Sequence, residues 1–186
     1  MSQPIVVPVI VVSMAVFIAA IIDIWKYKVH NLLTVPLFLS GVAYHCVVAG
    51  GAGLMDSLLG ALFGMGVLIV FYAMGGVGAG DVKLLAAVGA WLKFPLTFWV
   101  FIASSLAAGI YAMILVAYSG RTHETWTNLR IVWYRLLAVG RHLGAEDQIE
   151  VEVNRDDRRM RVIPYAAMIA VGMASLVGAG LILGKP

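Results

Sequence analysis

Apolar runs long enough to cross a bilayer recur along this chain and limit its possible folds. A membrane-spanning helix needs about 20 mostly apolar residues. Polar or glycine-rich stretches separate five such runs: Pro4–Ile22, Leu32–Val48, Ser57–Met74, Leu96–Tyr118 and Ile163–Leu183. The stretch between the second and third runs predicts a tight connection over Gly50–Asp56, with Asp56 and Ser57 as the N-cap of the next helix. The sequence therefore predicts an all-α, polytopic membrane protein.

Composition supports a membrane location. Hydrophobic residues make up 62% of the chain and charged residues 12%, about half the usual charged fraction of a soluble domain. A soluble domain of this length could not hide so much apolar surface, which argues against a soluble enzyme, a disordered tail and a nucleic-acid-binding module. The expected surrounding is a lipid bilayer, and no nucleic-acid partner is expected. The first apolar run has no Lys or Arg before it, which favours a retained span over a cleaved signal peptide.

Cysteine and histidine usage argues against a metal centre. The single cysteine, Cys46, excludes an intramolecular disulfide and a cysteine-based zinc site. The four histidines lack the His-Glu-x-x-His spacing of helical metalloproteases. No metal and no cofactor are expected.

The distribution of basic residues indicates a sixth span over Val82–Phe94, which is apolar but short. Lys and Arg collect on the cytoplasmic side of short loops. If this segment crosses the membrane, 11 of the 13 basic residues fall on one side, including the eight Arg of the 119–162 loop. If it does not cross, those Arg lie on the other side of the membrane from Lys26 and Lys28. Six spans in the plasma (inner) membrane are therefore expected, with the N-terminus outside and the long loop in the cytoplasm.

The 119–162 loop is the only long polar segment, and we expect one domain over residues 1–186. Within the loop, Glu124–Gly144 has helical periodicity with an apolar face. This pattern fits a helix lying in the cytoplasmic interface and, equally, a packed cytosolic helix. Small residues at a spacing of four predict close helix packing, at Gly60 and Gly64 and in a ladder on the last span. The ladder residues are Ala166, Ala170, Ala174 and Gly178.

Two aspartates are the candidate functional residues. Asp23 follows the first span, and Asp81 begins the fourth, directly after a glycine cluster. Two spans separate them, so both are expected at the cytoplasmic ends of their helices, where they can meet across the bundle. Ionisable groups at membrane depth are costly, rare and usually functional. Two such carboxylates suit an aspartic protease, in which one takes a proton from water while the other, protonated, polarises the scissile carbonyl. Such a pair is expected to share a proton and titrate as a unit.

The glycines before Asp81 fit the same chemistry. A backbone close to a scissile peptide must avoid side-chain clashes, which Gly78 and Gly80 allow. Structural alternatives exist for each feature. Asp23 could pair with Lys26 at the interface, Asp81 could cap a helix N-terminus, and the glycines could form a plain turn. A phosphate loop is disfavoured because the cluster lacks a Gly-Lys-Ser/Thr ending and no strand precedes it.

The segment Gly78-Ala79-Gly80-Asp81 resembles the Gly-x-Gly-Asp motif of the type IV prepilin peptidases, which are membrane aspartic proteases. Asp23, with Asn31 eight residues later, resembles that family's first catalytic aspartate and its downstream Pro-Asn, although His30 stands at the Pro position. Presenilin-like proteases share Gly-x-Gly-Asp but carry their first aspartate in a Tyr-Asp pair, whereas Ile22 precedes Asp23 here.

The resemblance implies removal of a short basic leader from a pilin-like precursor, after a glycine, at the cytoplasmic face. Many members carry a cytoplasmic domain with paired Cys-x-x-Cys motifs and methylate the new N-terminus. With Cys46 alone, this chain looks like the short, peptidase-only form of the tight-adherence (Flp) pilus or archaellin type, so cleavage without methylation is expected. Pilus or secretion assembly components are further expected partners.

Two other residues are weaker site candidates. Lys83 could offset the negative charge of the site or contact a backbone group. It could also serve only as a basic anchor on the cytoplasmic side. Asn31 could contact substrate or cap a helix. The residues alone leave two other functional classes open. One is a proton-coupled transporter or channel, and the other is a non-catalytic scaffold of a secretion system. A transporter predicts acidic residues along a path at mid-bilayer depth, whereas both aspartates are expected at one edge.

Overall fold

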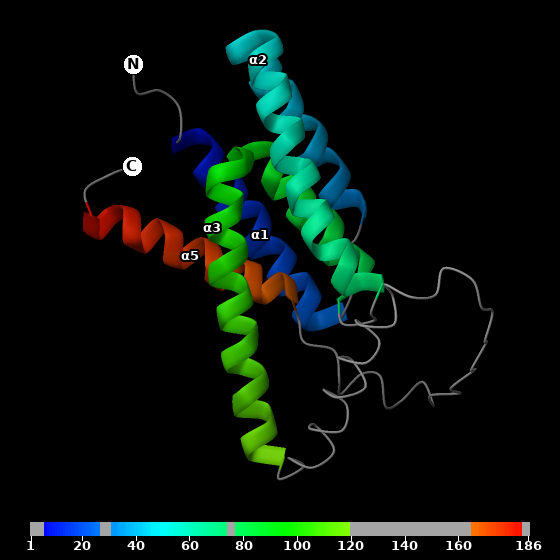
Figure 1. The fold of residues 1–186 in the computed structure, drawn as a ribbon, viewed down its shortest axis with the longest axis vertical. Coiled ribbons are helices and arrows are strands. Elements are labelled where there is room, and N and C mark those ends of the chain that lie inside the picture. The colour runs from blue at the N-terminus through cyan, green and yellow to red at the C-terminus, as the bar shows by residue number, and fades with distance from the viewer. Residues whose placement is uncertain (1–5, 27–30, 74–76, 120–164, 184–186) are drawn as a thin grey trace, which may run out of the picture. The chain divides into compact units, whose positions relative to one another are not determined.

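The structure, a computed structural model, describes residues 6–26, 31–73, 77–119 and 165–183. These residues form four helices: α1 (Val6–Lys26), α2 (Asn31–Ala73), α3 (Ala79–Ser119) and α5 (Tyr165–Leu183) (Figure 1). The predicted all-α class is confirmed. Three of the helices are long and apolar enough to cross a membrane, over Val6–Asp23, Asn31–Ala73 and Ala79–Leu115, and α5 has a shorter apolar stretch over Tyr165–Gly180.

The two longest helices are each interrupted by one residue. Gly50 breaks α2 with φ 61° and ψ −144°, and Lys93 breaks α3 with φ 61° and ψ 178°. A positive φ is easy for glycine but strained for lysine. Pro95 lies in the first turn after the second break, where a missing N–H leaves no helical bond unmade. The four helices therefore supply six helical segments within the described residues.

Contacts with the first half of α3 show that the two halves of α2 run in opposite directions. In the first half of α2, Asn31 bonds to Lys83, and His45 bonds to the Trp91 carbonyl. In the second half, Gly64 faces Leu85 and the Ser57 hydroxyl donates to the Ala90 carbonyl. In the first half of α2, residue numbers along α2 and α3 increase in the same direction. In the second half of α2 they increase in opposite directions. α2 is thus a helical hairpin, whose halves lie side by side in Figure 1.

The first half of α3 lies at the centre of the packing. From Asp81 to Leu92 every residue is buried except Lys83. A helix that is apolar all round is expected to be enclosed by its neighbours. The core around it draws on all four helices and includes Val16 of α1, Leu68 of α2, Leu85 and Val88 of α3, and Ile169 of α5.

The close packing predicted for Gly60 and Gly64 is confirmed. A Cβ at Gly60 would overlap the Gly89 carbonyl, and one at Gly64 would overlap the Leu85 carbonyl. The backbones of α2 and α3 therefore touch along this seam, as small residues permit in membrane helices.

The helix over the first apolar run continues through Asp23 to Lys26. Two sequence-based predictions need correction. The connection over Gly50–Asp56 is wrong, since the helix resumes directly after Gly50. Asp56 and Ser57 are therefore not an N-cap. Asp56 forms an ion pair with Lys93 at 2.9 Å, and the Ser57 hydroxyl donates across to α3.

The Ser57 bond gives a testable prediction for stability. The buried Ala90 carbonyl accepts a hydrogen bond from the Ser57 hydroxyl at 2.7 Å. Ser57→Ala removes this bond. We expect the free energy of unfolding to fall by about 1 kcal/mol. Ser175→Ala is the matched control, because that hydroxyl only bonds to Gly172 of its own helix. Unfolding titrations in mixed detergent micelles measure both, and equal losses would contradict an interhelical role for Ser57.

Contacts divide the chain into two units, one formed by residues 1–108 and 163–186 and the other by residues 109–162. In the second unit the described residues are Gly109–Ser119, the end of α3. The amphipathic segment predicted over Glu124–Gly144 lies outside the described residues, and so does His30.

Candidate active site

One end of each of the four helices contributes to a common site in the first unit. Asp23 lies in the last turn of α1, and Asp81 lies in the first turn of α3. The two carboxylates are close enough to interact electrostatically, and both lie near Ala166 of α5. Asn31, the first residue of α2, bonds to Lys83 beside them. The structure thus brings the two predicted aspartates together.

Asp81 is positioned by a reciprocal cap at the start of α3. The Asp81 backbone N–H donates to the Gly78 carbonyl at 3.1 Å, and the Gly78 N–H donates to Asp81 Oδ2 at 3.3 Å. The second bond is one half of a capping box, in which the side chain of the third helical residue accepts from the N-cap N–H. The capping alternative for Asp81 is therefore correct for one carboxylate oxygen, and that bond also fixes the side-chain direction.

Each aspartate also has one carboxylate oxygen that is buried and unpaired among the described residues. Asp23 and Asp81 are each only 7% exposed. Asp23 Oδ2 and Asp81 Oδ1 are buried and have no hydrogen-bond partner among the described residues. A buried polar atom without a partner costs free energy, and such atoms are expected where a site must receive water or substrate. One oxygen of Asp81 thus caps α3, while the other has no hydrogen-bond partner among the described residues.

The other predicted site residues surround this pair. Lys83 Nζ donates to Asn31 Oδ1 at 2.9 Å on the exposed side, so these two residues tie the start of α2 to the start of α3. Gly78 lies against Asp81, where an added Cβ would be 3.3 Å from Oδ2. Gly80 lies in the first turn of α3 beside Asp81. No contact of Lys83 with either carboxylate is seen among the described residues.

Two residues of α5 were not expected in the site. The sequence predicted Ala166 only as part of a small-residue packing ladder, and its position near the two carboxylates is one that no side-chain pattern reveals. Tyr165 lies beside it, 7% exposed, within electrostatic range of Asp81 and next to Ser104 and Ser105 of α3. A tyrosine placed directly before a long apolar run was the available signal.

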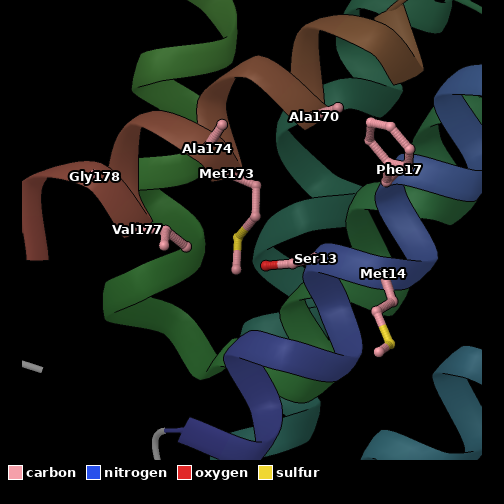
Figure 2. Close-up of a pocket in the computed structure, with 8 residues that line it drawn as sticks. All are labelled: Ser13, Met14, Phe17, Ala170, Met173, Ala174, Val177 and Gly178. Carbon is pink, nitrogen blue, oxygen red and sulfur yellow. The ribbon is translucent and has the colours of Figure 1, made fainter. Parts of the chain in front are cut away.

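A separate apolar cavity of about 570 Å³ lies between α1 and α5 (Figure 2). Figure 2 shows Met173 of α5 and Ser13 of α1 pointing toward one another across it. Neither aspartate lines this cavity. Its walls are the same two helices that carry Asp23 and Ala166 at their ends.

Comparisons with known proteins point to one family. The sequence profile of the type IV leader peptidase family matches residues 10–113, a stretch that includes Asp23 and Asp81. The prepilin leader peptidase/N-methyltransferase of Aeromonas salmonicida (strain A449) is 35% identical over 102 residues, which cover 51% of this chain and 35% of that protein. Leader peptidase HopD of Escherichia coli is 38% identical over 104 residues, covering 50% of this chain and 66% of that protein.

The matches have a limited extent. The chain spans about a third of the length of the Aeromonas relatives. No solved structure matches. The helices from α1 to most of α3 fall within the profile, whereas α5 lies outside it. Because the profile covers more than half of the sequence and contains both aspartates, this multi-pass membrane protein belongs to the type IV leader peptidase family.

Proposed function

We propose that this chain is a membrane aspartic endopeptidase that removes the short leader of pilin-like precursors at the cytoplasmic face. The observation that carries the proposal is that Asp23 and Asp81, from different helices, are both buried and lie within electrostatic range of one another. Membership of the family supports the reaction type. The curated relatives named as prepilin leader peptidase and leader peptidase support the substrate class.

The mechanism follows from the two free oxygens. One carboxylate accepts a proton from a water molecule, which attacks the scissile carbonyl carbon. The other carboxyl group, protonated, donates a hydrogen bond to the carbonyl oxygen and then supplies the proton that the leaving amine needs. The cap from Gly78 keeps Asp81 in one orientation, so little reorganisation is required on the way to the transition state.

The transporter alternative is less well supported by the described residues. A proton path would need acidic side chains at intermediate depth. Among the described residues, the only acidic side chain besides the pair is Asp56, which is 55% exposed and lies at the other end of the helical hairpin, paired with Lys93.

We further propose six membrane spans with the N-terminus outside. The six helical segments and the reversal of direction within α2 support this topology. The basic residues of the 119–162 loop then face the cytoplasm. Single cysteines placed at Gly51 and at Arg130, in a Cys46→Ser background, test it with a membrane-impermeant thiol reagent. Labelling from outside is expected at position 51 alone, and labelling at position 130 would contradict the orientation.

Cleavage without methylation is the expected activity. The purified full chain, reconstituted in lipid, is mixed with a synthetic precursor that carries a short basic leader ending in glycine and an apolar helix behind it. With S-adenosylmethionine present, mass spectrometry is expected to show a single cut after the glycine and no methyl group on the new N-terminus. A methylated product would contradict the peptidase-only proposal, and an uncut precursor would contradict the proposed function itself.

A further inference from the structure

Thr34, in the first turn of α2, has a buried hydroxyl that forms no hydrogen bond within the described residues. Its side chain is 2% exposed, and its Oγ1 has no partner among them. Other hydroxyls of the described helices donate to backbone carbonyls, namely those of Ser13, Ser40, Ser57, Thr97, Ser104 and Ser175. An unpaired buried polar atom costs free energy, so it is expected where a ligand completes the bond.

Thr34 belongs to the face of α2 that packs against α3. The buried residues in the first half of α2 are Thr34, Leu37, Gly41 and His45, which recur every three or four positions and so share one side of the helix. The last three all contact Trp91 of α3. Trp91 Nε1 donates to the Leu37 carbonyl at 2.8 Å, His45 Nε2 bonds to the Trp91 carbonyl, and a Cβ at Gly41 would overlap the indole ring. The Thr34 side chain therefore faces α3 as well.

Helix geometry places Thr34 close to the level of Asp81 and slightly deeper in the bundle. The Asn31–Lys83 bond ties the start of α2 to the start of α3, and the first halves of the two helices run in the same direction. Thr34 follows Asn31 by three residues, and Asp81 precedes Lys83 by two. At a rise of 1.5 Å per residue, Thr34 lies roughly 5–8 Å deeper than Asp81 along the helix axis. Helical side chains tilt toward the N-terminus, which directs the Thr34 hydroxyl back toward the level of Asp81.

The unpaired hydroxyl of Thr34 is one of a set. Among the described residues, the buried side-chain oxygens without a partner belong to Asp23, Thr34, Asp81 and Tyr165. These residues lie in the last turn of α1 and in the first turns of α2, α3 and α5. Because protein interiors pair most of their polar groups, a set gathered at one end of the helices indicates a site that receives polar groups from a ligand.

We propose that the Thr34 hydroxyl binds the backbone of the substrate just behind the scissile bond. The inference rests on the proposed function, in which the substrate continues as an apolar helix after the cut. A peptide must be extended to be cut, so the start of that helix has to unwind. Backbone groups freed at membrane depth need new partners, and Thr34 offers a donor and an acceptor on the deeper side of the aspartates. Thr34 takes no part in proton transfer.

Thr34→Val tests the hydroxyl, because valine keeps the shape of the side chain. We expect kcat/KM for the synthetic precursor to fall about 10-fold, mostly through KM, since a peptide group of the substrate is left without its partner. The free energy of unfolding should be unchanged or higher, because the free protein loses an unpaired hydroxyl and no bond. A purely structural threonine predicts wild-type kcat/KM in Thr34→Val, and that result would overturn the proposal.

Thr34→Ser and Thr97→Val are the matched controls. Serine keeps the hydroxyl, so Thr34→Ser should recover kcat/KM to within about threefold of wild type. The buried Thr97 hydroxyl donates to the Lys93 carbonyl of its own helix, so Thr97→Val should lower stability and leave KM unchanged. Equal losses of kcat/KM in Thr34→Ser and Thr34→Val, or an equal rise of KM in the two valine variants, would contradict a bond to substrate.

Binding measured without cleavage separates this inference from the proposed function. In an Asp81→Asn background, the affinity of a fluorescent synthetic precursor for the chain in lipid nanodiscs should be about 10-fold lower with Thr34→Val and unchanged with Thr97→Val. If wild type cleaves nothing but this difference is seen, only the proposed function fails. If Thr34→Val leaves the affinity unchanged, the inference fails.

Precursors with one backbone ester identify the bonding partner. An ester in place of one of the first three peptide bonds behind the cleavage point removes an N–H and weakens the carbonyl as an acceptor. Against one of these three precursors, Thr34→Val should lower the affinity at least threefold less than it does against the all-amide precursor, as a double-mutant cycle requires of interacting groups. A full loss against all three would show that Thr34 does not bind this stretch of backbone.

Discussion

Asp23→Asn and Asp81→Asn are each expected to lower cleavage of a prepilin-like precursor by about a thousandfold or more. Each substitution removes a group that must take or give a proton, and general acid–base catalysis contributes about 10²–10⁴ in rate. The loss should appear in kcat, with KM little changed, because asparagine keeps the shape of the side chain. Single-turnover cleavage of the synthetic precursor by the reconstituted chain measures the effect.

Asp56→Asn is the control for this pair of variants. Asp56 is an aspartate of the same chain, but it is exposed and bonded to Lys93, and exposed ion pairs contribute about 0–1 kcal/mol. Its cleavage rate should match that of wild type. All three variants should insert to the same level, since asparagine in place of a buried carboxylate removes a charge without opening a cavity. Wild-type cleavage in either Asp23→Asn or Asp81→Asn would exclude that residue from the mechanism.

The meeting of the two aspartates was predictable because membrane spans fix depth. Each crossing returns the chain to the other side, so the two intervening spans of the proposed topology would place Asp23 and Asp81 at the same level. The helical class was predictable too, because apolar runs of this length have few ways other than a helix to satisfy their backbone hydrogen bonds in a bilayer. Depth alone does not say which helices are neighbours, so the contribution of α5 was not predictable from span counting.

Other features depend on backbone conformation that residue types do not report. Gly50 reverses α2 within one residue, whereas the sequence suggested a seven-residue connection because glycines cluster there. Lys93 adopts a positive φ that a lysine rarely takes, and its side chain bonds to Asp56.

Gly89→Ala is expected to be among the most destabilising single substitutions in the first unit. A Cβ at this position would overlap the Gly60 carbonyl of α2, a backbone atom that cannot rotate away. The seam between α2 and α3 must then open, which we expect to lower the free energy of unfolding by about 2–3 kcal/mol. Because Asp81 stands on the same half of α3, cleavage should be lost together with stability. Unfolding in mixed detergent micelles and precursor cleavage measure the two losses on one preparation.

Gly66→Ala separates the effect of contact from that of helix propensity. Gly66 also lies in a helix, α2, but an added Cβ meets nothing within 4 Å. Alanine should therefore leave stability unchanged or raise it by up to about 1 kcal/mol, because glycine is a poor helix former. If Gly66→Ala and Gly89→Ala behaved alike, the close backbone contact between α2 and α3 would be wrong. The support that it gives to the position of Asp81 would then be lost, and the aspartate pair would need a different explanation for its geometry.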